Sequence, residues 1–141
     1  MHNIPSRFIV IACLLLLSPL CTLADDLGTL AGKWTMTRKN SEGQTVIHKL
    51  QFKENKFTFR AMSEGGSTIL YAEGDAKVVT TAGVKLVSLT NIKAGASDTE
   101  IESTEEVYAA PFRVSGSTCY LASGLDRERE EAPRMDVYRK E

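Results

Sequence analysis

The sequence has few of the residues from which metal and redox sites are built. Of its three cysteines, Cys13 and Cys21 lie in an N-terminal apolar stretch, which leaves Cys119 alone in the rest of the chain. A single thiol forms no intrachain disulfide, so we expect packing and hydrogen bonds to hold the fold. His48 is the one histidine beyond residue 24. With no second histidine and no cysteine pair there, the sequence predicts no metal site and no cofactor.

The chain also lacks a strong charge of one sign. It has 17 basic and 18 acidic residues, a formal net charge of -1. Without residues 1–24, whose only charged residue is Arg7, the net charge becomes −2. A charge this small does not attract nucleic acid or a charged membrane surface, so we expect neither as a partner.

Catalytic residue sets are missing as well. Cys119 and His48 could in principle form a catalytic dyad. However, a lone inward cysteine is typically a small buried apolar residue, and a lone inward histidine is typically a core residue. The acidic residues of segment 98–106 lack the glycine and the ligand spacing of a calcium loop, so a solvated loop is expected there. No nucleophile, base and orienting group can be assembled, and the sequence predicts a protein that is not an enzyme, with no catalytic residue.

Residues 1–24 have the layout of a secretory signal peptide. A short basic lead precedes the apolar run "FIVIACLLLL", Pro19 interrupts the longer apolar stretch from Phe8 to Leu23, and small residues precede the expected cleavage site after Ala24. The apolar run is shorter than the ~20 residues that cross a bilayer, so no membrane span is predicted after cleavage. We expect export to the periplasm or the medium, with residues 25–141 forming one domain.

What the remaining chain does have is hydrophobic alternation with a period of two. In segment 45–53, "TVIHKLQFK", one face is apolar apart from His48 and the other is mostly charged, which is typical of a strand with one buried face. Residues 54–56 predict a hairpin turn, and Gly74 predicts a bulge or corner within a long strand over 68–80. About eight such strands indicate an antiparallel sandwich or barrel.

Four short motifs narrow this choice. The chain contains "LAGKW", "LQFKENKFTF", "GSTCYLAS" and "VYRKE" in that order. This ordered set resembles the small lipocalin-like (calycin) β-barrel domains of the short type found in exported planctomycete-like bacterial proteins. The resemblance spans most of residues 27–141. It implies an all-β fold, a small antiparallel up-and-down barrel of about eight strands with a short N-terminal helical turn.

The same resemblance assigns a structural role to the Gly-x-Trp motif. It implies that Gly32 and Trp34 close one end of the barrel, with a basic side chain of the last strand lying over the indole ring. Arg139 and Lys140 are the two candidates for that cation. The planar guanidinium stacks well on an aromatic ring, so Arg139 is the expected residue.

The inner face of such a barrel is the one candidate binding site. Its expected lining residues are Met36, His48, Leu50, Phe52, Phe59, Leu70, Phe112 and Leu121. Eight-stranded barrels lie between interiors filled by side chains and interiors that hold a small ligand, and both remain open here.

Two functional hypotheses follow from this inner face. The first is an exported, non-enzymatic lipocalin-like domain that binds a small apolar or amphipathic molecule in its lumen. The second is a filled barrel that acts as a protein-interaction or inhibitor module through its charged loops, residues 93–106 and 124–133.

Overall fold

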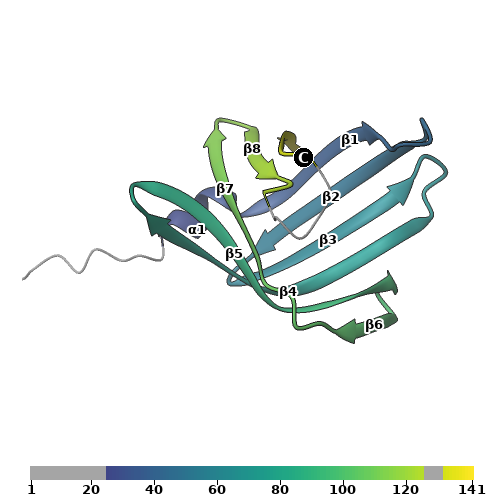
Figure 1. Cartoon of the computed structure of the whole chain (residues 1–141), viewed down its shortest axis with the longest axis horizontal. Coiled ribbons are helices and arrows are strands. Elements are labelled where there is room, and N and C mark those ends of the chain that lie inside the picture. Colours follow the sequence, from purple (N-terminus) through teal and green to yellow (C-terminus); the bar gives the residue numbers. More distant parts are fainter. Residues whose placement is uncertain (1–24, 126–131) are drawn as a thin grey trace, which may run out of the picture.

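The computed structural model describes residues 25–125 and 132–141, which form one short helix and nine strands (Figure 1). The expected signal peptide lies outside these residues, as does most of the expected loop 124–133. The elements are α1 (Asp25–Leu30), β1 (Gly32–Lys39), β2 (Thr45–Lys53), β3 (Lys56–Ser63), β4 (Thr68–Thr81), β5 (Val84–Ser97), β6 (Glu100–Ser103), β7 (Tyr108–Ser115), β8 (Thr118–Ser123) and β9 (Arg134–Lys140).

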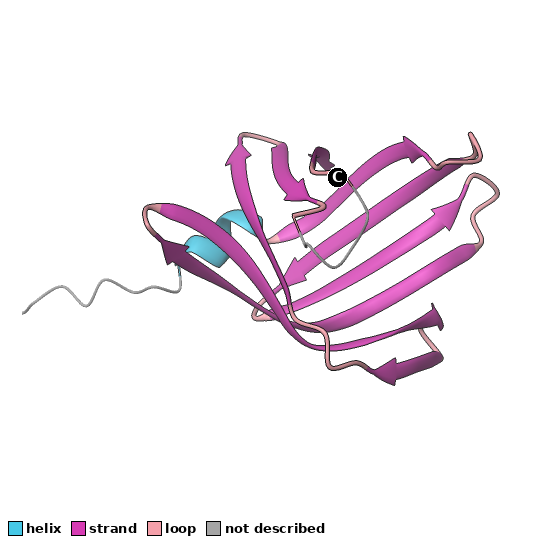
Figure 2. Ribbon diagram, in the orientation of Figure 1, coloured by secondary structure: helices cyan, strands magenta, loops and turns pink. Residues whose placement is uncertain are grey.

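Eight of these strands form a closed antiparallel barrel. The ring runs β1-β2-β3-β4-β5-β7-β8-β9, and the pairings of β4 with β5 and of β9 with β1 close it. Figure 2 shows α1 (cyan) at one end of the barrel, where it contacts β4. The turns that join β1 to β2 and β3 to β4 lie at the opposite end (Figure 1). The expected fold, an all-β barrel of about eight strands with a short N-terminal helical turn, is confirmed.

Tight turns between the strands follow from local backbone chemistry. β2 and β3 are joined by Glu54–Asn55, and β4 and β5 by Ala82–Gly83. Glu54, Ala82 and Gly83 have positive φ angles of 57°, 50° and 78°. This left-handed conformation is the one that matches a two-residue turn to the twist of its strands.

The long strand β4 changes register with β5 at Gly74, as the sequence predicted. Glu73 pairs with Lys93 and Asp75 pairs with Thr90, so two residue steps along β4 are matched by three along β5. β5 therefore carries one additional residue at this point. A Cβ atom at Gly74 would lie 2.6 Å from the Thr90 carbonyl oxygen. The absent side chain therefore lets the bulged segment of β5 approach β4.

Residues 93–106, which the sequence predicted to be a loop, are mostly strand. β5 continues to Ser97, and β6 pairs with its last residues. The prediction was wrong because this segment of small and acidic residues shows no hydrophobic alternation. It is a strand all the same, because its backbone groups pair. Gly95 allows the Glu100 carbonyl to come closer than any side chain would permit.

The core follows the predicted alternation of side chains. Trp34 pairs with Leu50 in β2, and Leu50 pairs with Phe59 in β3, so all three lie on the inner face. Trp34 is 1% exposed. The core therefore lies inside the barrel, at the end nearest α1.

Candidate functional site

Trp34 closes the α1 end of the barrel. Its Nε1–H donates to the carbonyl of Leu30 at 2.8 Å, which ties the end of α1 to β1. Lys140 lies over the indole ring, with Nζ 5.4 Å from the ring centroid. Gly32 has φ +118, and a Cβ there would lie 3.0 Å from Lys140 Cε. Glycine at this position therefore leaves room for the lysine stem above the ring.

The covering cation is Lys140 and not Arg139, so that prediction was wrong. Lys140 is the direct partner of Trp34 between β9 and β1, whereas Arg139 is the partner of Thr35. Successive side chains of a strand point to opposite faces, and only Lys140 shares a face with Trp34. Arg139 instead donates to Thr118 Oγ1 at 2.7 Å.

The expected lining residues divide into a packed group and a partly open group. Met36, Leu50, Phe52 and Leu121 are buried in the main apolar cluster. Phe59 and Phe112 are partly exposed and pack against that cluster. The α1 end of the interior is therefore filled by side chains, and exposure increases away from it.

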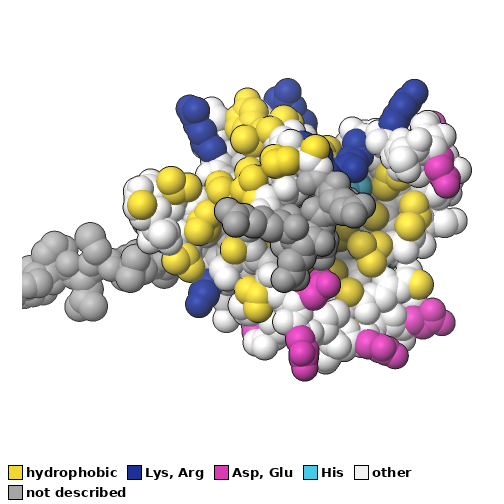
Figure 3. Space-filling model, viewed as in Figure 1, with side chains coloured by type: hydrophobic (Ala, Val, Ile, Leu, Met, Phe, Trp, Pro, Cys, Tyr) yellow, Lys and Arg dark blue, Asp and Glu magenta, His cyan; other side chains and the backbone are white. Residues whose placement is uncertain are grey.

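Leu70 marks the open part of the interior. It pairs with Ala61, which is buried on the same face as Phe59, yet Leu70 is 43% exposed. In Figure 3, hydrophobic side chains (yellow) are seen over β2–β4 and also over β7, β8 and the β4–β5 hairpin. The inner face thus presents apolar surface that no described side chain covers.

His48 lies beside this open part. Its ring meets that of Phe59 edge to face, with centroids 5.3 Å apart and an interplanar angle of 88°. Burial lowers its pKa from 6.5, the nearby positive charges of Arg38 and Arg134 lower it further, and Asp136 opposes them. His48 is therefore neutral at pH 7.

Next to His48 lie four polar residues that the sequence reasoning missed: Arg38, Ser123, Arg134 and Asp136. We call these four, together with His48, the inner polar cluster. Asp136 is 8% exposed; its Oδ2 accepts from Ser123 Oγ at 2.7 Å and its Oδ1 from Arg134 Nε at 3.1 Å. Continuing the two-residue period from Trp34 and Met36 to Arg38 would have identified the first member.

Arg38 has an unusual environment within this cluster. Its Nη1 is buried and has no hydrogen-bond partner among the described residues. Asp136, the carboxylate of the cluster, accepts from Ser123 and Arg134. A buried guanidinium nitrogen without an acceptor is energetically unfavourable, so an additional acceptor at Arg38 Nη1 would be stabilising.

Cys119 has no part in this site. It is buried in the apolar cluster and pairs with Tyr138 across β8 and β9. Burial raises the pKa of its thiol to about 11, so it is protonated at neutral pH and is not a thiolate nucleophile. Among the described residues, no group of three His, Cys, Asp or Glu side chains is placed to hold a metal ion.

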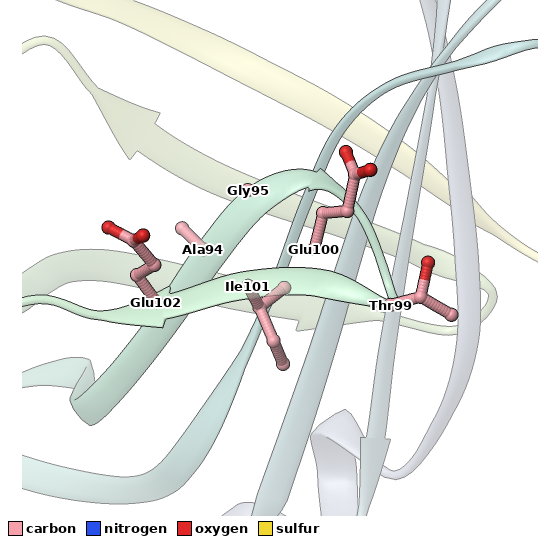
Figure 4. A pocket seen from close by; sticks show the side chains of 6 residues that line it. All are labelled: Ala94, Gly95, Thr99, Glu100, Ile101 and Glu102. Atoms are coloured by element: carbon pink, nitrogen blue, oxygen red, sulfur yellow. The ribbon is translucent and has the colours of Figure 1, made fainter.

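Two hollows lie on the outside of the barrel. One, of about 430 Å³, lies between β5 and β6, where Glu100 and Glu102 point to one side of the hairpin and Ile101 to the other (Figure 4). The other, of about 340 Å³, lies on the outer face of β1–β4 and includes Arg60 and Tyr71. Leu70 lines neither of these two hollows.

Tyr71 is a buried residue that the alternation pattern does not predict. It lies on the outer face of β4, and the Arg60 guanidinium is 5.1 Å from its ring centroid. Arg60 also forms an ion pair with Asp98 at 3.2 Å, at the tip of the β5–β6 hairpin. The acidic hairpin is thus tied to the barrel wall, and it is not a free loop.

Comparison with known proteins adds no relative. No family model matches the chain, and neither a curated protein nor a solved structure gives a significant match. In the part of the chain that the structure describes, no helix has the length and apolar character needed to cross a membrane.

We expect His48 to make the stability of the fold depend on pH. Its pKa is lowered in the folded state, so the unfolded chain binds a proton more readily. The free energy of unfolding should therefore fall as the pH drops below about 6.5, and this loss should level off below the folded-state pKa. Urea unfolding between about pH 7 and pH 5 measures it, and His48→Gln should flatten the curve. The same slope in both proteins would rule out this role of His48.

Proposed function

We propose that this chain is an exported, non-enzymatic lipocalin-like domain that binds a small apolar or amphipathic molecule in the open part of its barrel. The proposed site comprises Phe59, Leu70 and Phe112, with His48 as its polar neighbour. The packed residues near Trp34 serve as the floor of this site. Export and the lipocalin-like relationship enter this proposal from the sequence, through the signal-peptide layout of residues 1–24 and the ordered motifs.

The observation that carries the proposal is the exposure of Leu70. A side chain on the inner face of a filled barrel is expected to be buried, but Leu70 is 43% exposed while its partner Ala61 is buried. Phe59 is the diagonal neighbour of Leu70 on the same face, and Phe112 is a further partly exposed inward residue. Apolar area of this kind gains about 25 cal/mol per Å² when a ligand removes it from water.

A neutral dye tests the proposal. Nile red carries no charge and fluoresces strongly in apolar surroundings, so titration with the protein measures access to the apolar interior. We expect saturable binding, and we expect Leu70→Asp to weaken it about tenfold or more because a carboxylate would replace apolar contact surface. The dissociation constant from the fluorescence titration is the quantity to compare.

Val79→Asp provides the matched control. Val79 lies in the same strand β4 and is 37% exposed, and it points to the outer face because its neighbour Val78 packs against the core. This variant should bind the dye like the parent protein. Equal weakening by both substitutions, or no binding by the parent, would refute a site on the inner face.

A further inference from the structure

The inner polar cluster carries more positive than negative charge. Arg38 and Arg134 contribute two positive charges and Asp136 one negative charge, while burial and the two arginines hold the pKa of His48 low and the ring neutral. Arg134 and Asp136 are in contact through Nε and Oδ1. Within residues 25–125 and 132–141, the charge of this cluster without a carboxylate in contact is that of Arg38.

Arg38 lies in a part of β1 that is no longer paired with β9. β1 and β9 are paired at Trp34–Lys140 and Thr35–Arg139, and the pairing stops there. Continued in steps of two, this register would place Arg38 opposite Asp136, but these parts of β1 and β9 are not bonded to each other. The barrel wall therefore does not bring the carboxylate of Asp136 onto Arg38.

Arg38 also adjoins the apolar surface of the proposed site. His48 is the direct partner of Met36 in β1, which makes Arg38 its diagonal neighbour on the same face. His48 in turn contacts Phe59 through its ring. A continuous inner surface thus runs from the half-buried Arg38, whose Nη1 is buried, across a neutral imidazole, to apolar side chains.

We propose that the ligand is an amphiphile with a negatively charged head group of the carboxylate type, bound by Arg38, and with an apolar body along Phe59 and Leu70. This inference rests on the proposed function and specifies its ligand class. A carboxylate accepts hydrogen bonds from the planar guanidinium fork, and such charge-assisted bonds are among the strongest in proteins. The head group would supply the acceptor that Arg38 Nη1 lacks among the described residues.

Two probes of equal chain length separate the head group from the body. Decanoate and decanol share their apolar chain and differ at the head. Isothermal titration calorimetry at pH 7 should show decanoate binding at least tenfold more tightly than decanol. Arg38→Gln should lower decanoate affinity about 10- to 100-fold and leave decanol affinity within about twofold. Arg38→Lys, which keeps the charge without the fork, should fall between the two.

Arg113→Gln is the control for loss of an arginine charge. Arg113 is exposed and pairs with Tyr120 on the outer face of the barrel, so both affinities should stay unchanged. Equal affinity of the parent protein for decanoate and decanol, or equal loss of both in Arg38→Gln, would overturn the carboxylate assignment while the proposed function stands. Absence of binding by either probe would refute the proposed function and this inference together. The acid-to-alcohol ratio of the parent protein decides the matter even if a variant does not fold.

Discussion

Trp34→Ala should lower the free energy of unfolding by about 3–5 kcal/mol, the range for removing a large aromatic residue from a core. Trp34 is 1% exposed, and its indole fills the α1 end of the barrel. The substitution would also leave the Leu30 carbonyl without its indole donor. The closed end of the barrel would then have a cavity bounded by the residues that now pack on the ring.

Chemical denaturation of the parent and of Trp34→Ala measures this loss. Lys140→Met separates the ring from its covering cation, because methionine keeps an unbranched apolar side chain over the indole and removes the charge. An exposed cation over an aromatic ring contributes about 0.5–1 kcal/mol, so this variant should lose no more than that. A loss below about 1 kcal/mol for Trp34→Ala would show that the indole does not hold the barrel end together.

Gly74→Ala should destabilise the protein by about 1–3 kcal/mol, which is typical of forcing an additional group into a packed position. A new Cβ would lie 2.6 Å from the Thr90 carbonyl oxygen, 2.9 Å from Cε1 of Phe57 and 3.0 Å from the Asn91 carbonyl oxygen. Two of these three atoms belong to the backbone, so they move only if the bulged segment of β5 moves. In a strand without such a contact the same substitution would be favourable, because alanine loses less backbone entropy than glycine.

Gly65→Ala is the control, since it makes the same chemical change in the turn between β3 and β4. Its nearest neighbour would be Ser63 Oγ at 3.9 Å, an ordinary contact distance. The free energy of unfolding should change by less than about 0.5 kcal/mol. If Gly74→Ala proved as harmless as Gly65→Ala in thermal or urea unfolding, the close approach of β4 and β5 would be contradicted.

The fold was predictable because its main signal is local. Alternation in segments such as 45–53 fixes which side chains face inward, and it placed Leu50 and Phe59 on one face, where the register confirms them. Gly74 marked the bulge because a glycine within a strand indicates close backbone approach. Closure of the sheet into a ring came from the motif resemblance, since alternation is equally compatible with a sandwich.

Features that depend on pairing between distant strands were less accessible. The choice between Arg139 and Lys140 turns on a one-residue register between β1 and β9, which nothing in either strand specifies. The β5–β6 hairpin forms through backbone bonds in a segment of small and acidic residues, so side-chain periodicity could not reveal it. The inner polar cluster brings together residues of β1, β2, β8 and β9, of which only His48 stood out in the sequence.

The barrel interior therefore has a packed apolar end near α1 and a more exposed, partly polar end away from α1. Trp34 and the core residues around it account for the stability of the barrel, and they leave little room for a ligand at the α1 end. Leu70, Phe59 and His48 lie where apolar surface stays exposed, beside Arg38, whose Nη1 has no hydrogen-bond partner in the part of the chain that the structure describes. This arrangement allows the more exposed end to bind a molecule while the core stays packed.

Amide chemical shifts of isotope-labelled protein, recorded by NMR while decanol is added, locate the bound molecule directly. Binding in the barrel should shift the signals of His48, Phe59 and Leu70 together and saturably. Tyr120 and Val137, exposed apolar residues paired on the outer face of β8 and β9, should not respond. Shifts confined to Tyr120 and Val137, or no saturable shift at all, would contradict an interior binding site.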